Sequence, residues 1–352
     1  MTDHSHPVPA ALPSLGRVRP ESKVRSYARL GKLDVYDYYL SMAVVVAVVA
    51  PPAVQALRAG QLTSAGQLAP VALTLALFLL GEVFVVMAMV ALDDVTGFRD
   101  GSDARNYGPD HPRRKRLRKP LVAGTLTPRE ALGFAGVTAA AGAALWGAAA
   151  ALAPHRPLWT LVLTGVVFAV ALQYSYGLQI SYRGFQEVFL AGLGAALVIA
   201  PYGLVTGSFS GFVLVQGVLF GFGPLLFGVY SNTNDVDGDR EAGRLTVAAV
   251  TTPRGNAVFV GVLSAAECAT AVFASATGLA PWWFVLWMAP VTVLRVRQYL
   301  IGFPPGGAEG DIMQARRRGF VVHRVATVLL IGANLLAAAL HWAPNSASGG
   351  GT

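Results

Sequence analysis

Charged residues are scarce in this chain, and their scarcity excludes an ordinary soluble domain. They make up 13% of the 352 residues, whereas hydrophobic residues make up 54%. The only cysteine, Cys268, lies inside an apolar run, so the sequence provides neither a disulfide framework nor a thiolate metal site. A composition so apolar and so poor in charge predicts an integral membrane protein.

Apolar runs of about 17 to 25 residues, the length that crosses about 30 Å of hydrocarbon, recur along the chain between polar breaks. The runs lack the alternating pattern of barrel strands, so helices are the predicted spanning element. We therefore expect an all-α integral membrane protein with about nine transmembrane helices. The expected spans are residues 36–54, 70–92, 131–153, 158–176, 186–206, 212–230, 256–276, 281–301 and 321–342.

Basic residues gather on one side of these spans. If the N-terminus is cytoplasmic, all but Arg58 and Arg156 of the 27 Lys and Arg residues fall on the cytoplasmic side or at its edge. This distribution predicts a multi-pass plasma-membrane protein with a cytoplasmic N-terminus and an odd number of spans. The net charge of +8 then belongs to the face that meets anionic membrane lipid, and we expect no nucleic-acid partner. The domain prediction is a disordered arm at 1–21, a membrane domain at 22–344 and a disordered tail at 345–352.

An acidic stretch follows the sixth expected span. Asp235 and Asp239 are four residues apart, so on a continuing helix they share one face with Asn232. Like charges on one face repel unless a cation lies between them, and Mg²⁺ prefers such oxygen ligands together with substrate phosphates. Arg240 and Arg244 follow on the next turns, where guanidinium groups can hold a diphosphate. The stretch predicts a magnesium and diphosphate site at a membrane face.

Another acidic stretch, the first in chain order, follows the second expected span. Asp93, Asp100 and Asp103 are spaced by nearly whole helical turns, so they share a face if the helix continues. A helix break at Gly97 or Gly101 is the alternative, and it would remove that shared face. The equivalent positions of the two stretches favour a joint role.

Glu82 lies about three helical turns before Asp93, on nearly the same face but deeper in the membrane. One interpretation is that it lines a cavity, where it carries a proton or orients a substrate. The other is that it is a neutral carboxylic acid hydrogen-bonded to a neighbouring helix. The sequence favours neither.

Several segments resemble one family. Residues 232–246 match D-x-x-x-D-x-x-x-G-[KR]-x-T, and they resemble the second aspartate motif of the UbiA superfamily of intramembrane prenyltransferases. The first acidic stretch, ending in Arg-Asp-Gly-Ser-Asp, resembles the form in the branch that prenylates 1,4-dihydroxy-2-naphthoate. Residues 118–124 and 174–187 are similar to two further loops of that superfamily. The resemblance covers about residues 25 to 340.

This resemblance implies a nine-helix UbiA-type bundle with a cytoplasmic cap that binds a prenyl diphosphate through Mg²⁺. The prenyl group would pass to a small lipophilic acceptor, aromatic or a quinone precursor. Carried over by position, the metal ligands would be Asp103, Asp235 and Asp239. Candidate catalytic acids are Asp93, Asp100 and Glu82. Candidate substrate contacts are Asn232, Lys119, Arg183, Arg240, Arg244 and Tyr174.

The first motif departs from the family pattern N-D-x-x-D. Asp93 stands where the family has Asn, and Gly97 stands where it has Asp. Loss of that carboxylate resembles UbiA-type membrane terpene cyclases, which need no external acceptor, so cyclisation is the alternative function. Asp93 or Asp100 would then compensate as a ligand. A nine-span transporter is a third, weaker hypothesis, because carriers hold their charged sites near the bilayer midplane and these acids lie at one rim.

Overall fold

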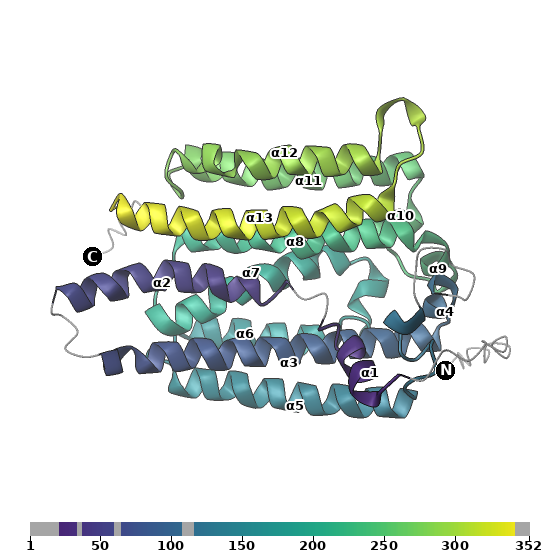
Figure 1. Ribbon diagram of the computed structural model, residues 1–352, viewed down its shortest axis with the longest axis horizontal. Helices are drawn as coiled ribbons and strands as arrows, with labels where there is room; N and C mark the ends of the chain where they lie inside the picture. The colour runs from purple at the N-terminus through teal and green to yellow at the C-terminus, as the bar shows by residue number, and fades with distance from the viewer. Residues whose placement is uncertain (1–20, 34–36, 60–64, 108–115, 342–352) are drawn as a thin grey trace, which may run out of the picture.

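The computed structural model describes residues 21–33, 37–59, 65–107 and 116–341. These residues contain helices and no strands. Figure 1 shows long helices lying roughly side by side. A helix satisfies its backbone polar groups by hydrogen bonds within its own segment, which suits a hydrocarbon environment. The long helices are α2 (Leu40–Arg58), α3 (Ala69–Arg99), α5 (Pro128–Leu152), α6 (Leu158–Leu172), α7 (Gln186–Thr206), α8 (Gly211–Asn234), α11 (Pro253–Ala276), α12 (Phe284–Gly302) and α13 (Ile312–Ala339).

Seven of these helices are long and apolar enough to cross a membrane. Two shorter apolar helices, at Leu40–Ala56 within α2 and at Leu158–Leu172, complete the set. Each of the nine predicted spans coincides with one helix of this set. The prediction of an all-α, multi-pass membrane protein is confirmed, with the count of nine an approximation that includes the two shorter helices.

Several helices extend beyond their predicted bounds at the polar end, and α3 and α13 extend furthest. Helix α3 continues to Arg99, and α13 begins at Ile312 instead of residue 321. The side chain of Asp311 starts α13 by accepting a 2.9 Å hydrogen bond from the Gln314 backbone N–H. Hydropathy misses these turns because it follows the apolar part of a helix only. The expected end at residue 342, residues 1–20 of the arm and the tail at 345–352 lie outside the described residues.

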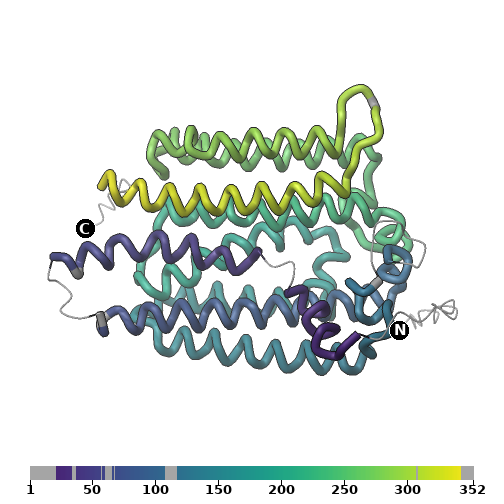
Figure 2. Tube along the Cα trace, in the orientation of Figure 1, coloured from purple at the N-terminus to yellow at the C-terminus, as the bar shows by residue number. Residues whose placement is uncertain are grey.

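Short helices gather at one end of the bundle, on the right in Figure 1. We call this end the cap; it consists of α1 (Lys23–Leu30), α4 (Ser102–Asn106), α9 (Val236–Glu241) and α10 (Val247–Val250). A 3₁₀ turn, η3 (Ile180–Arg183), joins the cap through a 3.0 Å bond from the Leu245 N–H to the Tyr182 carbonyl. The colour trace in Figure 2 shows that chain segments far apart in sequence meet there.

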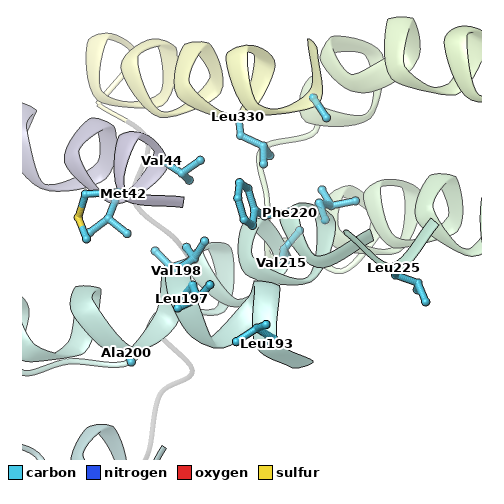
Figure 3. Close-up of a cluster of buried hydrophobic side chains, with 14 of the residues drawn as sticks. Met42, Val44, Leu193, Leu197, Val198, Ala200, Val215, Phe220, Leu225 and Leu330 are labelled. Atoms are coloured by element: carbon cyan, nitrogen blue, oxygen red, sulfur yellow. The ribbon is translucent and has the colours of Figure 1, made fainter. Parts of the chain in front are cut away.

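The core of the bundle lies where α2, α7, α8 and α13 meet (Figure 3). Val44, Leu197, Phe220 and Leu330 are at most 1% exposed there. Helices α7 and α8 approach closely elsewhere along their contact, because a Cβ at Gly194 would lie only 2.6 Å from the Gly221 Cα. This close packing fixes the start of α7 beside the end of α8, where the second acidic stretch begins.

Candidate functional site

A cavity of about 240 Å³ lies between the cap and the ends of the long helices. One part is lined by acids and amides of both acidic stretches together with basic side chains. The other part is apolar and follows α8 toward its middle. The polar lining includes Asp93, Asp103, Asn232, Asp235, Asp239, Lys32, Arg118, Lys119 and Arg244, and the apolar lining includes Met89, Val90, Leu190, Pro224, Phe227 and Phe320.

The first acidic stretch reaches the cavity through a turn. Helix α3 passes through Gly97 and ends at Arg99, and Gly101 then adopts a left-handed φ of 80° before α4 begins. The turn lays the Asp103 carboxylate against Gly97, where an added Cβ would lie 2.8 Å from the Asp103 Cγ. The break expected at one of the two glycines therefore occurs at Gly101. Asp103 joins Asp93 by folding back, whereas a continuous helical face was the other expectation.

Two lysines hold the acids of this stretch. Lys119 Nζ lies 2.7 Å from Asp94 Oδ1 and 2.8 Å from Asp103 Oδ1, and Lys32 Nζ lies 2.6 Å from Asp94 Oδ1. Burial raises the pKa of Asp103 to about 6, against the lowering effect of Lys119. Burial alone would lower the pKa of Lys119, but Asp103 and Asp94 raise it well above its usual range. Lys119 is therefore a permanent cation inside the cavity.

Asp93 faces the same cavity from α3. Its Oδ1 accepts a 2.7 Å hydrogen bond from Ser175 Oγ and lies 3.6 Å from Arg244 Nη2. Ser175 is in turn 2.8 Å from Ser181 Oγ. These hydroxyls leave the second carboxylate oxygen of Asp93 available to the cavity.

The second acidic stretch is also broken. Helix α8 ends at Asn234, Asp235 is the junction, and α9 begins at Val236, so the expected continuous helix does not form. The Asp239 N–H still donates to the Asp235 carbonyl at 2.8 Å, which keeps one helical turn across the junction. Asn232, Asp235 and Asp239 consequently all line the cavity. Burial raises the pKa of Asp239 to about 7, against the lowering effect of Arg244.

Arg244 is fixed by an aromatic platform. Its guanidinium carbon lies 4.1 Å from the ring centroid of Tyr182, and its Nη2 donates a 2.6 Å hydrogen bond to the Tyr182 hydroxyl. That hydroxyl donates to Asp100 Oδ2. Burial raises the pKa of Tyr182 far above its usual range, so the phenol keeps the proton it donates. Asp100, Tyr182 and Arg244 form a chain that ends in the cavity.

Eight predicted site residues line the cavity, and four do not. Those outside are Glu82, Asp100, Arg183 and Arg240. Glu82 is 1% exposed, and it accepts hydrogen bonds of 3.1 and 3.2 Å from Ser41 Oγ on α2. Of the two interpretations of Glu82, this contact is the hydrogen bond to a neighbouring helix. Asp100 also accepts a 2.9 Å bond from the N–H of Ser102, the first residue of α4. Arg183 and Arg240 are exposed, and Arg240 Nε donates to the Ala249 carbonyl at 2.8 Å.

The structure adds residues that sequence reasoning missed. Lys32 enters the cavity from a left-handed backbone with φ of 54°, an uncommon conformation for a residue other than glycine. Asn106 packs so closely on α9 that a Cβ at Gly238 would lie 2.7 Å from its side chain. His323 lines the apolar part, with its ring 4.7 Å from that of Phe220. The two acidic motifs do not indicate these three residues, because each one reaches the site through contacts between distant segments of the chain.

The donor set of the cavity fits Mg²⁺. Asp103 Oδ2, in the cavity lining, is buried without a hydrogen-bond partner in the described part of the chain. The same holds for Oδ2 of Asp94, which contacts Lys119 but does not line the cavity. Among the described residues, no three His, Cys, Asp or Glu side chains lie close enough together to hold a metal ion by themselves. Mg²⁺ is usually bound by one or two carboxylates, with substrate phosphates and water completing the shell. Carboxylates contributed separately by the two acidic stretches suit that mode of binding.

Comparisons with known proteins identify a family and similar folds. The model of the UbiA prenyltransferase family matches residues 40–304. A comparison with curated protein sequences finds no match. Similar folds occur in a UbiA homologue from Archaeoglobus fulgidus bound to DMAPP and Mg²⁺ (14% identity, TM-score 0.58, 90% of this chain and 99% of that chain). They also occur in the apo UbiA homologue from Aeropyrum pernix K1 (19% identity, TM-score 0.56, 86% of this chain and 98% of that chain). A third similar fold is that of digeranylgeranylglyceryl phosphate synthase (11% identity, TM-score 0.58, 89% of this chain and 99% of that chain).

Proposed function

Because the chain belongs to the UbiA prenyltransferase family, we propose that it is a Mg²⁺-dependent intramembrane prenyltransferase. It ionises a prenyl diphosphate and transfers the prenyl group to a small lipophilic acceptor, aromatic or a quinone precursor. The observation that carries the proposal is the single cavity in which acids of both stretches, Lys119 and Arg244 adjoin an apolar pocket. The Archaeoglobus fulgidus homologues bound to DMAPP or GPP with Mg²⁺ support the substrate class.

The ionic part of the cavity binds the diphosphate. Asp103, Asp235 and Asp239 would hold Mg²⁺, and the bound ion would supply Lewis-acid stabilisation of the charge on the diphosphate leaving group. Lys119 and Arg244 donate hydrogen bonds to diphosphate oxygens. Since Tyr182 holds the guanidinium of Arg244 flat, less side-chain entropy is lost when the diphosphate binds.

The apolar part of the cavity receives the prenyl tail. Leu190, Phe227 and Phe320 exclude water from the reacting carbon, which prevents its capture as an alcohol. Tyr174 also lines the cavity, and its ring packs 4.9 Å from that of Phe189. A ring face beside an allylic cation stabilises it electrostatically.

The cap and the N-terminus face the cytoplasm of a plasma-membrane protein in this proposal. The distribution of Lys and Arg supports this orientation. A cytoplasmic cap also gives the water-soluble diphosphate leaving group a route out of the site. The exposed basic residues of the cap then meet anionic lipid headgroups.

Cyclisation is the second candidate, favoured by Gly97 at the place of a family aspartate. A cyclase uses the same ionisation step but closes the cation onto a double bond of its own chain. The cavity supports ionisation equally well for both reactions. Product analysis therefore has to separate them.

The test is diphosphate release by purified protein with Mg²⁺ and prenyl diphosphates of several lengths, with and without naphthoate or quinone-type acceptors. Mass spectrometry identifies the products. Prenylated acceptor is expected, and its loss in the Asp235→Asn and Asp239→Asn variants assigns the reaction to this cavity. A cyclic product formed without acceptor would establish the cyclase instead, and no diphosphate release with any substrate would refute both.

A further inference from the structure

A second cavity lies outside the substrate site, between α12 and α13. Its volume is about 330 Å³, and it shares no lining residue with the first cavity. Its walls combine aliphatic side chains with two arginines and one glutamine. The lining residues are Leu294, Arg297, Gln298, Leu300, Ile301, Arg318, Val321 and Val322. We call this cavity the α12–α13 groove.

The two arginines of the groove lie at similar distances from the ends of their helices. Arg297 is five residues before the end of α12, and Arg318 is six residues after the start of α13, which places them about 8 and about 9 Å from the helix ends. Both side chains are exposed, and neither has a carboxylate partner within the described residues. No acidic residue lines the groove. Two positive charges near these helix ends thus have no compensating carboxylate among the residues that the structure describes.

The inner wall of the groove is rigid. Gln298 is fully buried, its Nε2 donates to the Ala315 carbonyl at 3.0 Å, and its Oε1 accepts from Arg295 Nη1 at 2.6 Å. Arg295 is already bound to Glu267 by contacts of 2.6 and 2.9 Å. The interior arginine is therefore satisfied, and only the two outer arginines remain available to a ligand.

The outer rim of the groove is apolar and faces lipid. Leu300 and Val321 remain 46% and 47% exposed on opposite walls. A free inorganic anion would gain nothing from these aliphatic walls, whereas an acyl chain would bury them. The combination of paired arginines and an apolar trough thus selects a molecule with an anionic head and a hydrocarbon tail.

We propose that the α12–α13 groove binds one anionic phospholipid. Arg297 and Arg318 hold the phosphate from two helices, and an acyl chain lies along Leu300 and Val321. Basic pockets between transmembrane helices recognise anionic headgroups in this way. The bound lipid would join α13, which lines the substrate cavity through Phe320 and His323, to α12 at the membrane face.

The experiment adds phosphatidylglycerol to detergent-purified, full-length protein without Mg²⁺ or substrate, and counts bound lipid by native mass spectrometry. We expect one tightly bound lipid and an affinity about thirtyfold lower in the R297Q/R318Q double variant, since each basic residue near a charged membrane surface contributes about fivefold. R317Q is the matched control, because Arg317 is exposed and adjacent to Arg318 but does not line the groove. Thermal unfolding in neutral detergent checks that both variants fold.

Phosphatidylcholine and inorganic phosphate separate the possible sources of binding. Tight binding of phosphatidylcholine, or binding of inorganic phosphate as tight as that of phosphatidylglycerol, would overturn the assignment. Equal losses in R317Q and the double variant would also overturn it, because they would indicate diffuse surface charge. An unchanged double variant would do the same. None of these outcomes depends on prenyl transfer, so this proposal and the proposed function fail separately.

Discussion

Asp103 lies against Gly97, in the space that a side chain on residue 97 would need. An ideal Cβ there would lie 2.8 Å from both Cγ and Oδ2 of Asp103. The Asp103 carboxylate, which arrives from α4, therefore occupies space beside α3 that the side chain of an aspartate at position 97 would need. Glycine at 97 and aspartate at 103 depend on one another.

The first prediction concerns Gly97→Ala. The added methyl group displaces the Asp103 carboxylate, and a misplacement of about 1 Å in a reacting site costs about a hundredfold in turnover. We expect that loss together with weaker Mg²⁺ dependence, measured by titrating Mg²⁺ in a diphosphate-release assay. Gly133→Ala is the matched control, because a Cβ at Gly133 meets open space. Normal turnover in Gly97→Ala would show that Asp103 is not a metal ligand.

A carboxylate moved back onto α3 provides a second prediction. Asp103→Ala removes the oxygen ligand, and adding Gly97→Asp supplies another at the same place without the steric conflict. We expect the double variant to recover about tenfold of the activity lost in Asp103→Ala, in line with the typical contribution of about 1.5 kcal/mol from one charged contact. Equal activities of the single and double variants would contradict the exchange of positions.

The third prediction is a dependence of stability on pH. Burial raises the pKa of Asp239 to about 7 and that of Asp103 to about 6, above the ordinary value of 3.8. Between about pH 4 and about pH 7, the folded metal-free protein holds protons that the unfolded chain has released, so its free energy of unfolding falls as the pH rises. Mg²⁺ needs the deprotonated carboxylates and is expected to restore stability at the upper end of this range.

Thermal unfolding with and without Mg²⁺, at about pH 5.5 and about pH 8, measures this dependence. The Mg²⁺-induced increase in Tm is expected to be large at the higher pH and small at the lower pH. An asparagine at position 239 cannot titrate, so the metal-free Asp239→Asn variant should lose part of the pH dependence of its stability. A Mg²⁺ effect that is equal at both pH values would exclude these carboxylates as ligands.

The fourth prediction compares two arginines of the second motif. Arg244 lines the cavity on the Tyr182 ring, whereas Arg240 is exposed and bonded to a backbone carbonyl. Arg244→Lys loses the stacked, planar donor, and we expect kcat/KM to fall about thirtyfold, equivalent to about 2 kcal/mol. The sequence predicts that both arginines contact the diphosphate. In that case Arg240→Lys and Arg244→Lys would lower kcat/KM by similar factors. A loss confined to Arg244→Lys would assign the contact to Arg244 alone.

The bundle was predictable because the hydrocarbon thickness imposes a strict length on each span. Residues 186–206 illustrate this, since the predicted span and α7 have the same bounds. The start of α13 was not predictable from hydropathy, because Arg316, Arg317 and Arg318 continue the helix in the polar region. An apolar run marks only the part of a helix that lipid covers. The polar turns beyond it have to be located from capping residues such as Asp311.

The candidate site was predictable where its cavity-lining side chains lie close together in sequence. Asp235 and Asp239 illustrate this, although a junction replaces the helix expected between them. Contacts between distant segments gave no signal. Lys32 meets Asp94 across 62 residues, and Tyr182 meets Asp100 across 82. Such pairs depend on how the bundle closes, which helical periodicity in one segment does not describe.

The last prediction tests the buried ion pair between α11 and α12. Arg295 and Glu267 are 2% and 5% exposed, and two short contacts join them. Removing one partner leaves an unpaired buried charge, so Glu267→Met is expected to lower the free energy of unfolding by about 4 kcal/mol. The double variant Glu267→Met/Arg295→Met should lose less stability than either Glu267→Met or Arg295→Met alone. The reason is that replacing both charges by apolar groups removes the desolvation cost as well. Thermal unfolding of the three variants in one detergent measures the coupling, and additive losses would show that the two charges do not stabilise one another in the membrane.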